Sequence, residues 1–576
     1  MKSLQPTSEA IYIKHILILL VITLLVWGNT LSNGFAYDDT VTIANNQFIR
    51  EWGNIPKLLS KDYFNLSGEL TYRPLVTLTY FLDYSLWGMK PSKYHLTNLI
   101  IHASNVIFLY LFIILLLGNV KIAFLSALLF DVHPVQAEAV NAISFREDLL
   151  TVFFLLPSFI LFIRLFVDFK SGYIRRLFYS VSLSLYALAL FSKEMAITYP
   201  LFLIGYIYSF HSEKVRERIG YFISLIGGYV IVTLIYLLIY LGPLGNSNSR
   251  EFPYTIPDLP IRLLTLPMVI VRYFLLFIFP YNLNADYIPD FNSSLIEPSL
   301  IISLIIISGI GAAAILLSRK DRRAIYGMFW FFISLMPVMN IVPIAYVIAE
   351  RYLYLPLIGL SFFTSIFLIT TYNGMPGYIK IGGLSALGII VILLSIRSVY
   401  RNIDWKDDMI LWSKTIITSP NSFMAHNNLG IAYANHGNLN EAIKEYKTAI
   451  RLKPDYLNGY NNLGIAYASH GNLNEAVKEY KTAIRLKPDD PLPYYNLGNA
   501  YGKQGRWQEA IEAYKTSLSL KPDSADTHYK LGLVYFLQEH YQEAFLEWNT
   551  VISITPDHVS AKNGLEILKK KTEQTP

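Results

Sequence analysis

Long apolar runs fill the first ~400 residues of the chain, and a polar segment with an internal repeat forms the rest. A helix needs about 20 apolar residues to cross a bilayer, or fewer where protein surrounds it. The pattern predicts eleven membrane spans, near 15–33, 96–117, 120–132, 149–168, 176–192, 196–210, 219–241, 297–317, 325–338, 353–371 and 381–399. A further apolar stretch, 262–280, is expected to be re-entrant or to lie at the membrane interface.

The basic residues between the spans predict the orientation of the protein. Three short segments carry them: Lys170, Arg175 and Arg176; Lys214, Arg216 and Arg218; and Arg319, Lys320, Arg322 and Arg323. Short loops rich in Lys and Arg face the cytoplasm. With the N-terminus inside, eleven crossings satisfy this rule and put residues 402–576 on the extracytoplasmic side, whereas a crossing at 262–280 would break it. The first apolar run is expected to remain as a span and not to be cleaved as a signal peptide, because ten more spans follow it.

The polar segment repeats itself with a period of 34 residues. "NNLGIAYANHGNLNEAIKEYKTAIRLKPD" begins at Asn427, and a nearly identical stretch begins at Asn461. Leucine, glycine and proline recur at this period, as Leu429, Leu463, Leu497 and Leu531, as Gly430, Gly464, Gly498 and Gly532, and as Pro454, Pro488, Pro522 and Pro556. These units resemble tetratricopeptide repeats, which are pairs of antiparallel helices. One period further back, Trp412 and Pro420 fit a degenerate half-repeat.

Such repeats stack into a superhelix with a concave groove. Asparagines recur on the first helix of each unit, as Asn427, Asn428, Asn461, Asn462 and Asn496. Their amides can bond an extended peptide backbone whatever its side chains, so we expect them to bind acceptor peptides. The alternative for these residues is a solvated surface or packing inside the repeats.

Composition supports an all-α protein in two parts, a polytopic membrane domain at 1–401 and a repeat superhelix at 402–576. Of the 576 residues, 53% are hydrophobic and 16% are charged, whereas a soluble domain carries about 25% charged residues. The chain has no cysteine, which excludes disulfides, thiolate metal sites and a cysteine nucleophile.

Ionisable residues gather in the loops that this topology places outside the cytoplasm. The loops read YDDT (37–40), YRPL (72–75), HPVQAEAVNAISFRED (133–148), SKE (192–194) and AERYLYLP (349–356). Asp38 and Asp39 follow the first span directly. Ionisable groups beside a membrane are costly and often functional, although an aspartate can also cap a short helix.

The same loops carry a family resemblance. The stretches YDDTVTIANN, YRPLVTLTYFLDYSLWG, HLTNLIIH, HPVQAEAVNAISFREDLL, SKEMAITYP and AERYLYLPLIGLS, followed by the repeats, cover nearly the whole chain. They resemble the transmembrane-and-TPR O-mannosyltransferase family of the GT-C superfamily, in a prokaryotic-type member. Family members often have Arg-Ala-Asp where this chain has Arg146-Glu147-Asp148, a mild departure that keeps the charged ends.

The resemblance implies a membrane glycosyltransferase that moves a hexose, with mannose favoured, from a polyprenyl-phosphate carrier to Ser or Thr hydroxyls of proteins. Asp38 would be the general base that takes the hydroxyl proton, and Asp39 its partner or an acceptor-orienting group. Because guanidinium binds phosphate in bidentate fashion, the donor phosphate is expected at four basic residues, Arg351 and Lys193 first and then Arg73 and Arg146. His133, Glu138, Asp148 and Glu194 are expected to shape the pocket.

The expected partners are the polyprenyl-phosphate sugar, the bilayer, and acceptor proteins bound by the repeats, with no nucleic acid. No cofactor is expected, since the lipid-linked sugar is a substrate. No metal is expected either, because His133 and Glu138 lack a third ligand. The absence of a C-terminal retrieval signal favours a bacterial inner membrane over an endoplasmic reticulum.

Two other classes of protein compete with the enzyme. A non-catalytic membrane anchor could display the repeats as a scaffold for protein assembly, but one span would suffice for that. A transporter would carry ionisable groups in mid-span and paired repeats in its membrane domain, whereas here the charges gather at one face and no repeat is seen in residues 1–400. Substitution of Asp38 separates the enzyme from the scaffold, because only an enzyme would lose transfer with binding intact.

Overall fold

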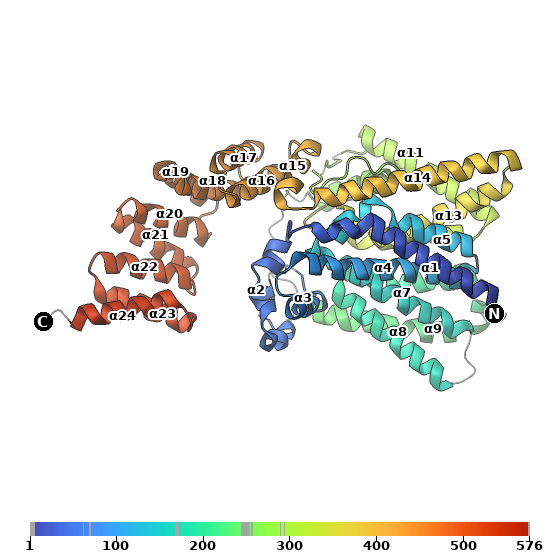
Figure 1. Cartoon of the computed structure of the whole chain (residues 1–576), viewed down its shortest axis with the longest axis horizontal. Helices are drawn as coiled ribbons and strands as arrows, with labels where there is room; N and C mark the ends of the chain where they lie inside the picture. Colours follow the sequence, from blue (N-terminus) through green and yellow to red (C-terminus); the bar gives the residue numbers. More distant parts are fainter. Residues whose placement is uncertain are drawn as a thin grey trace. The chain divides into compact units, whose positions relative to one another are not determined.

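The computed structural model describes residues 6–61, 63–67, 69, 71–167, 172–242, 254, 257–288, 290–292 and 294–573. The chain divides into two compact units, Met1–Thr418 and Ser419–Pro576. All regular elements among the described residues are helices, which confirms the expected all-α class (Figure 1). Residues 402–418, which we expected in the repeat domain, belong to the first unit.

The first unit is a bundle of apolar helices with shorter helices at one end. Its long or apolar members are α1 (Pro6–Trp27), α4 (Pro91–Leu117), α5 (Val120–Asp131), α7 (Arg146–Val167), α8 (Gly172–Ser192), α9 (Tyr199–Leu241), α10 (Leu259–Ile278), α11 (Pro298–Lys320), α12 (Ala324–Leu335), α13 (Pro356–Gly374) and α14 (Gly377–Asp404). Nine of the described helices are long and apolar enough to cross a membrane, or ten if α5 and Pro134–Asn141, bent by 52°, form one broken span. Length and composition therefore confirm a multi-pass membrane protein, with fewer qualifying helices than the eleven spans expected.

Helix α9 accounts for part of this difference, because it turns back on itself. The rings of Tyr199 and Tyr229 lie 5.5 Å apart between their centroids, although 30 residues of straight helix would separate them by about 45 Å. The two arms therefore pack against each other, as the separate spans expected at 196–210 and 219–241 would. Lys170 and the side chains of Lys214, Arg216 and Arg218, on which the predicted orientation partly depends, lie outside the described residues.

Helix α10 changes the count in the other direction, because it is one of the nine qualifying helices although no crossing was expected at 262–280. We expected 262–280 to be re-entrant or interfacial, and the structure has an unbroken helix of 20 residues there, which rules out a re-entrant break. Near its start, Arg262 donates to the carbonyls of Asn340 and Ile341. Near its end, the carbonyl of Phe277 bonds the His133 ring. Both ends thus contact loops at one end of the bundle, which fits the interfacial position better than a crossing.

A buried segment closes this end of the bundle. Every residue from 125 to 152 is buried, and the segment continues from α5 through α6 (Ala137–Asn141) into α7. Buried backbone and side-chain polar groups need hydrogen-bond partners, and loops that are distant in sequence provide them here. Asn33, for example, donates to Asn141 and to the carbonyl of Asn402. We call this end, formed by loops 33–39, 133–145 and 339–353, the Asp38 end.

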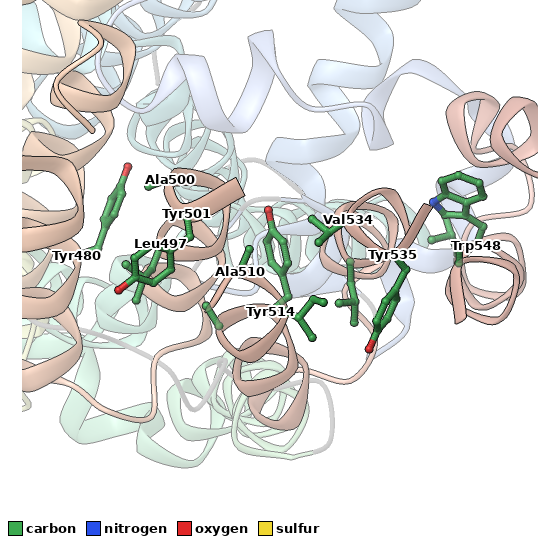
Figure 2. Close-up of a cluster of buried hydrophobic side chains, with 14 of the residues drawn as sticks. Tyr480, Leu497, Ala500, Tyr501, Ala510, Tyr514, Val534, Tyr535 and Trp548 are labelled. Carbon is green, nitrogen blue, oxygen red and sulfur yellow. The ribbon is translucent and has the colours of Figure 1, made fainter. Parts of the chain in front are cut away.

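The second unit consists of helix pairs in the order that the 34-residue period predicts. The helices are α16 (Phe423–Asn435), α17 (Leu439–Leu452), α18 (Leu457–Ser469), α19 (Leu473–Leu486), α20 (Pro491–Lys503), α21 (Trp507–Leu520), α22 (Ala525–Leu537), α23 (Tyr541–Ile554) and α24 (Val559–Glu573). Alternating small and aromatic side chains such as Ala500, Ala510, Tyr514 and Trp548 fill the core between them (Figure 2).

The recurring glycines let the two helices of each repeat approach closely. A Cβ at Gly430, Gly464, Gly498 or Gly532 would fall within 2.6 Å of Tyr446, Tyr480, Tyr514 or Trp548 on the paired helix. Such a separation is shorter than van der Waals contact, so only glycine fits without a shift of the ring. The periodic Gly in the sequence is thus explained by one aromatic side chain per repeat.

Candidate active site

A cavity of about 370 Å³ opens at the Asp38 end of the first unit. It is lined by Asp38, Val41, Thr42, Glu69, Thr71, Arg73, Ser144, Phe145, Glu147, Lys193, Glu194, Pro337, Val338, Ile344, Ala345, Tyr346, Arg351 and Tyr352. The expected outer loops therefore meet around one space. Four carboxylates and three basic side chains face it, together with several aromatic rings.

Asp38 is exposed on the wall of this cavity. Its backbone carbonyl begins a short π-helix, Thr40–Ala44, and accepts from Val41 and Thr42. Its carboxylate accepts no hydrogen bond from the residues that the structure describes. Desolvation by the surrounding protein raises the pKa of Asp38 to about 6, against the opposing charge of Arg351. An accessible carboxylate with such a pKa can accept a proton near neutral pH.

Asp39 faces the interior instead. It is fully buried, and its two carboxylate oxygens accept from the backbone N–H groups of Ser144, at 2.6 Å, and Ala36, at 3.3 Å. Burial raises the pKa of Asp39 to about 7, and the bond from Ser144 opposes that rise. The geometry therefore gives Asp39 a role in joining the first loop to Ser144, and it leaves Asp38 as the acid that can reach a substrate.

Arg351 is held by Glu138 and a set of aromatic rings. Its Nη1 donates to Glu138, and its backbone N–H donates to the same carboxylate at 2.9 Å. Its guanidinium carbon lies 4.0 Å from the Phe145 ring centroid and about 5 Å from Tyr346 and Tyr352. Among the described residues no other acceptor bonds this guanidinium, so its remaining N–H groups can bind an anion in the cavity.

Lys193 lies beside a pair of consecutive acids. Its Nζ is 2.6 Å from Asp148 and 3.7 Å from Glu147, and it lies over the ring of Tyr352. Asp148, one of the expected pocket residues, thus neutralises the lysine from behind the cavity wall.

Arg73 forms the most completely paired cation of the cavity. It donates to Glu147 through Nη1 at 2.9 Å and to both oxygens of Glu194 through Nε and Nη2. Burial alone would raise the pKa of Glu194, but the charges of Arg73 and Lys193 outweigh it and lower that pKa to about 2. These contacts make Arg73 a cross-link between three loops.

Five expected site residues lie outside the cavity lining: Asp39, Glu138 and Asp148, whose contacts are given above, and Arg146 and His133. Arg146 is buried and bonds Asp83, Asn98, Thr79 and the carbonyl of Tyr94, so four of its five guanidinium N–H groups are already occupied, and it lacks the pair of adjacent N–H groups that a donor phosphate would need. His133 stacks on Phe277 and bonds its carbonyl, and it caps the following turn at Val135. The turn, which was the alternative for His133, is the arrangement observed.

Sequence reasoning missed several cavity residues, of which Glu69 is the clearest. Its carboxyl faces the cavity, and burial with the nearby charge of Glu147 raises the pKa of Glu69 to about 8. Glu69 stands alone in a polar loop, and no motif distinguishes it. Glu147 and Tyr346 were also missed. Glu147 stands where family members often have alanine, and this difference was the one signal in the sequence that could have pointed to it.

The repeat asparagines form a ladder between consecutive units. Nδ2 of Asn462 donates to Asn427 at 2.9 Å, and Nδ2 of Asn496 donates to Asn461 at 2.8 Å. Asn427, Asn461 and Asn496 are buried, and Asn427 also donates to Asn428. For most of these side chains the packing alternative therefore describes the structure better than a free peptide-binding face.

A groove of about 450 Å³ does lie along the second unit. Its wall includes Asn496, Asn499, Lys503, Trp507 and Lys530, together with the rings of Tyr480, Tyr495 and Tyr514. Aromatic rings, amides and lysines suit an extended peptide, and of the expected asparagines Asn496 alone lines this groove.

No group of three or more His, Cys, Asp or Glu side chains in the described residues has the geometry of a metal site. The three basic side chains of the cavity are instead paired with carboxylates: Arg73 with Glu147 of the lining, and Lys193 and Arg351 with Asp148 and Glu138, which lie outside the lining. The chemistry of this set suits an anionic substrate group beside an acceptor whose proton must be removed.

The fold and the cavity define a helical membrane protein with an ionisable site at one end and a repeat unit after it. The family model "TPR repeat" matches residues 432–471, 466–505 and 503–539. Two solved structures are similar to the chain: MamA, 28% identical over 25% of this chain and 85% of that one at a TM-score of 0.24, and YrrB, a TPR protein, 20% identical over 30% and 87% at 0.25.

Curated relatives match both units. "Protein O-mannosyl-transferase F38B6.6" of Caenorhabditis elegans is 27% identical over 476 residues, which is 77% of this chain and 63% of the relative. "Protein O-mannosyl-transferase TMTC3" of Homo sapiens is 26% identical over 487 residues, 76% of this chain and 51% of the relative. "Protein O-mannosyl-transferase TMTC4" of Mus musculus is 26% identical, over 74% and 65%. The chain thus spans about half to two thirds of the length of these relatives.

Proposed function

We propose that the chain is a membrane glycosyltransferase that transfers a hexose, with mannose favoured, from a polyprenyl-phosphate carrier to Ser or Thr hydroxyls of proteins. The observation that carries this proposal is the accessible carboxylate of Asp38 in one cavity with the guanidinium of Arg351. The names of the relatives, protein O-mannosyl-transferases, support the same activity.

In the proposed reaction, the acceptor oxygen forms a bond to the anomeric carbon of the sugar as the bond from that carbon to the phosphate oxygen breaks. The hydroxyl proton moves to the carboxylate of Asp38, and the polyprenyl phosphate leaves with the bonding electron pair. Asp38 fits the role of base because it is accessible and lacks a bonded partner in the described part of the chain, whereas Asp39 is occupied by two backbone N–H groups.

Arg351, with Lys193, is proposed to bind the donor phosphate. Positive charge near the leaving oxygen stabilises the negative charge that develops there. The aromatic rings around Arg351 keep its guanidinium in place while leaving N–H groups for the phosphate. Arg73 and Arg146, which we expected as further phosphate ligands, are better explained as structural cross-links.

The proposed location of the reaction is the extracytoplasmic face. The C-terminal end of α14 lies at the Asp38 end, as the bonds of Arg401 to Glu350 and of Asn402 to Asn29 show. The basic segment 319–323, expected in the cytoplasm, begins in the last turn of α11. The loops that bind donor and acceptor would then both lie on the extracytoplasmic side, where a lipid-linked sugar in the outer leaflet can reach them. The membrane we expect is a bacterial inner membrane.

The repeat unit is proposed to bind acceptor proteins. Its groove offers aromatic rings, amides and lysines, and a bound segment would be kept at a raised effective concentration near the enzyme, in the mM range for a short connection.

The test is transfer by the purified full chain from a panel of polyprenyl-phosphate hexoses to proteins of a cell extract, detected by mass spectrometry of modified Ser and Thr. We expect transfer from the mannose donor and loss of transfer, by about 10²–10⁴-fold, in Asp38→Asn. Asp290→Asn, at an acid outside the cavity lining, is the matched control. Full activity of a folded Asp38→Asn protein would sink the assignment of the base, and binding of acceptor proteins without transfer from any donor would favour the scaffold.

A further inference from the structure

The backbone just before Asp38 has an uncommon conformation. Tyr37 has a φ of +62°, in the left-handed region that bulky L residues rarely adopt. Such a conformation is unfavourable by itself and persists only where surrounding contacts impose it. Contacts from other parts of the chain must therefore stabilise the backbone at Tyr37. The backbone conformation at Tyr37 in turn sets the direction of the next side chain, Asp38.

The support comes from α15 (Asp408–Thr418), the last helix of the first unit. The backbone N–H of Tyr37 donates to Oδ1 of Asp408 at 2.7 Å. The Tyr37 ring stacks on Trp412, with 5.2 Å between centroids and 27° between planes. Just before, the N–H of Gly34 donates to the carbonyl of Lys406 at 2.8 Å. The loop is thus bound at both its backbone and its ring by residues about 370 positions later.

The other side of Tyr37 reaches the cavity. Its hydroxyl donates to the hydroxyl of Tyr346 at 2.8 Å, and Tyr346 lines the cavity under the guanidinium of Arg351. A displacement of Tyr37 would therefore disturb the acid and the aromatic support of Arg351 together.

We propose that Asp408 and Trp412 are positioning residues for the transfer reaction: α15 holds Tyr37 in its left-handed conformation and thereby points Asp38 into the cavity. The proposal rests on the proposed role of Asp38. It assigns α15 to the catalytic unit, and not to the repeats that begin after it.

The experiment compares Asp408→Ala with Asp408→Asn in the full chain. An asparagine oxygen accepts the same N–H of Tyr37, so Asp408→Asn should keep transfer within about twofold. Alanine removes the acceptor, and since misplacement of a reacting group by about 1 Å can cost up to 10²-fold, kcat should fall at least tenfold with the KM for the donor unchanged. Asp407→Asn is the control, because Asp407 carries the same charge and, in the part of the chain that the structure describes, its carboxylate accepts only from the N–H of Ile410 in α15.

Hydrogen–deuterium exchange measures the support independently of transfer. The peptide that contains Tyr37 should exchange at least tenfold faster in Asp408→Ala, with wild-type rates in Asp408→Asn and Asp407→Asn. Unchanged exchange, or an equal loss of kcat in the asparagine and alanine variants, would overturn the proposal. If Asp38→Asn keeps full transfer, the proposed function of Asp38 has failed instead, and faster exchange in Asp408→Ala would still support α15 as the element that holds the loop.

Discussion

Asp38 and Asp39 are neighbours in sequence but lie in different environments. Asp39 is enclosed and bonds the backbone of Ser144, whereas Asp38 opens into the cavity beside Glu69 and Arg351. From the sequence alone, either aspartate could be the base. The direction of each side chain distinguishes them, and the strained backbone at Tyr37 determines that direction.

The pH dependence of transfer tests the base. Because the pKa of Asp38 is raised to about 6, the ionised form that can take a proton is present above that pH and is lost as pH falls through it. We expect log kcat/KM to drop with unit slope below about pH 6, as a single essential base requires. Glu147 contributes to raising this pKa, so Glu147→Gln should move the acid limb to lower pH. A profile that is flat from about pH 5 to 8 would contradict the assignment.

Donor affinity tests Arg351. Its replacement by Ala removes the guanidinium N–H groups that face the cavity, and a charge-assisted bond is worth about 1.5–3 kcal/mol. The Kd for a polyprenyl-phosphate hexose should therefore rise about 10- to 150-fold, measured by calorimetry, while the affinity for an acceptor peptide changes little. Arg323→Ala, at a cation paired with Asp321 after α11, is the control. Unchanged donor affinity would transfer the phosphate role to Lys193.

At the scale of elements, the glycine of each repeat decides how closely its helices pack. A methyl group at Gly464 would meet the Tyr480 ring at 2.5 Å, whereas a methyl group at Gly502, on α20, would meet no atom within 4 Å. Overpacking costs about 1–3 kcal/mol, so Gly464→Ala should lower the thermal stability of the repeats. Gly502→Ala should leave it unchanged or raise it by up to about 1 kcal/mol, because alanine is the better helix former. Equal effects of the two variants, followed by calorimetry or by exchange in α18–α20, would show that the close approach is not limiting.

The elements were more predictable from sequence than the site. Periodic Gly, Leu and Pro were enough to predict the repeats, because the two helices of every unit pack through the same residue positions. The site was harder, since Arg146, Glu147 and Asp148 are consecutive and successive side chains on a helix point about 100° apart. One therefore bonds Asp83, the next lines the cavity and the third meets Lys193. Contacts such as Tyr37 with Asp408 have no local signal at all, because a pair so distant in sequence is set by the tertiary fold.

For the whole molecule, the division between the units determines how the repeats should be removed. A chain that ends after Thr418 keeps α15 and its bond to Tyr37, whereas a chain that ends after Arg401 loses both. The first should transfer sugar to short peptides at near wild-type rates and fail with whole proteins. The second should fail with both. Equal transfer to peptides by the two truncated chains would argue against a role of α15 in the site.

The side of the membrane on which the repeats lie can be tested with a single cysteine, because the chain has none of its own. Ser469 is exposed on α18, so Ser469→Cys should be labelled by an impermeant maleimide added to intact cells. A cysteine in place of Ser318, half-buried near the end of α11, should react only after the membrane is opened, since by the positive-inside rule we expect the basic segment 319–323 at this end of α11 to face the cytoplasm. The opposite pattern would invert the topology. It would place Asp38 in the cytoplasm as well, because α14 returns the chain to the Asp38 end before the repeats begin.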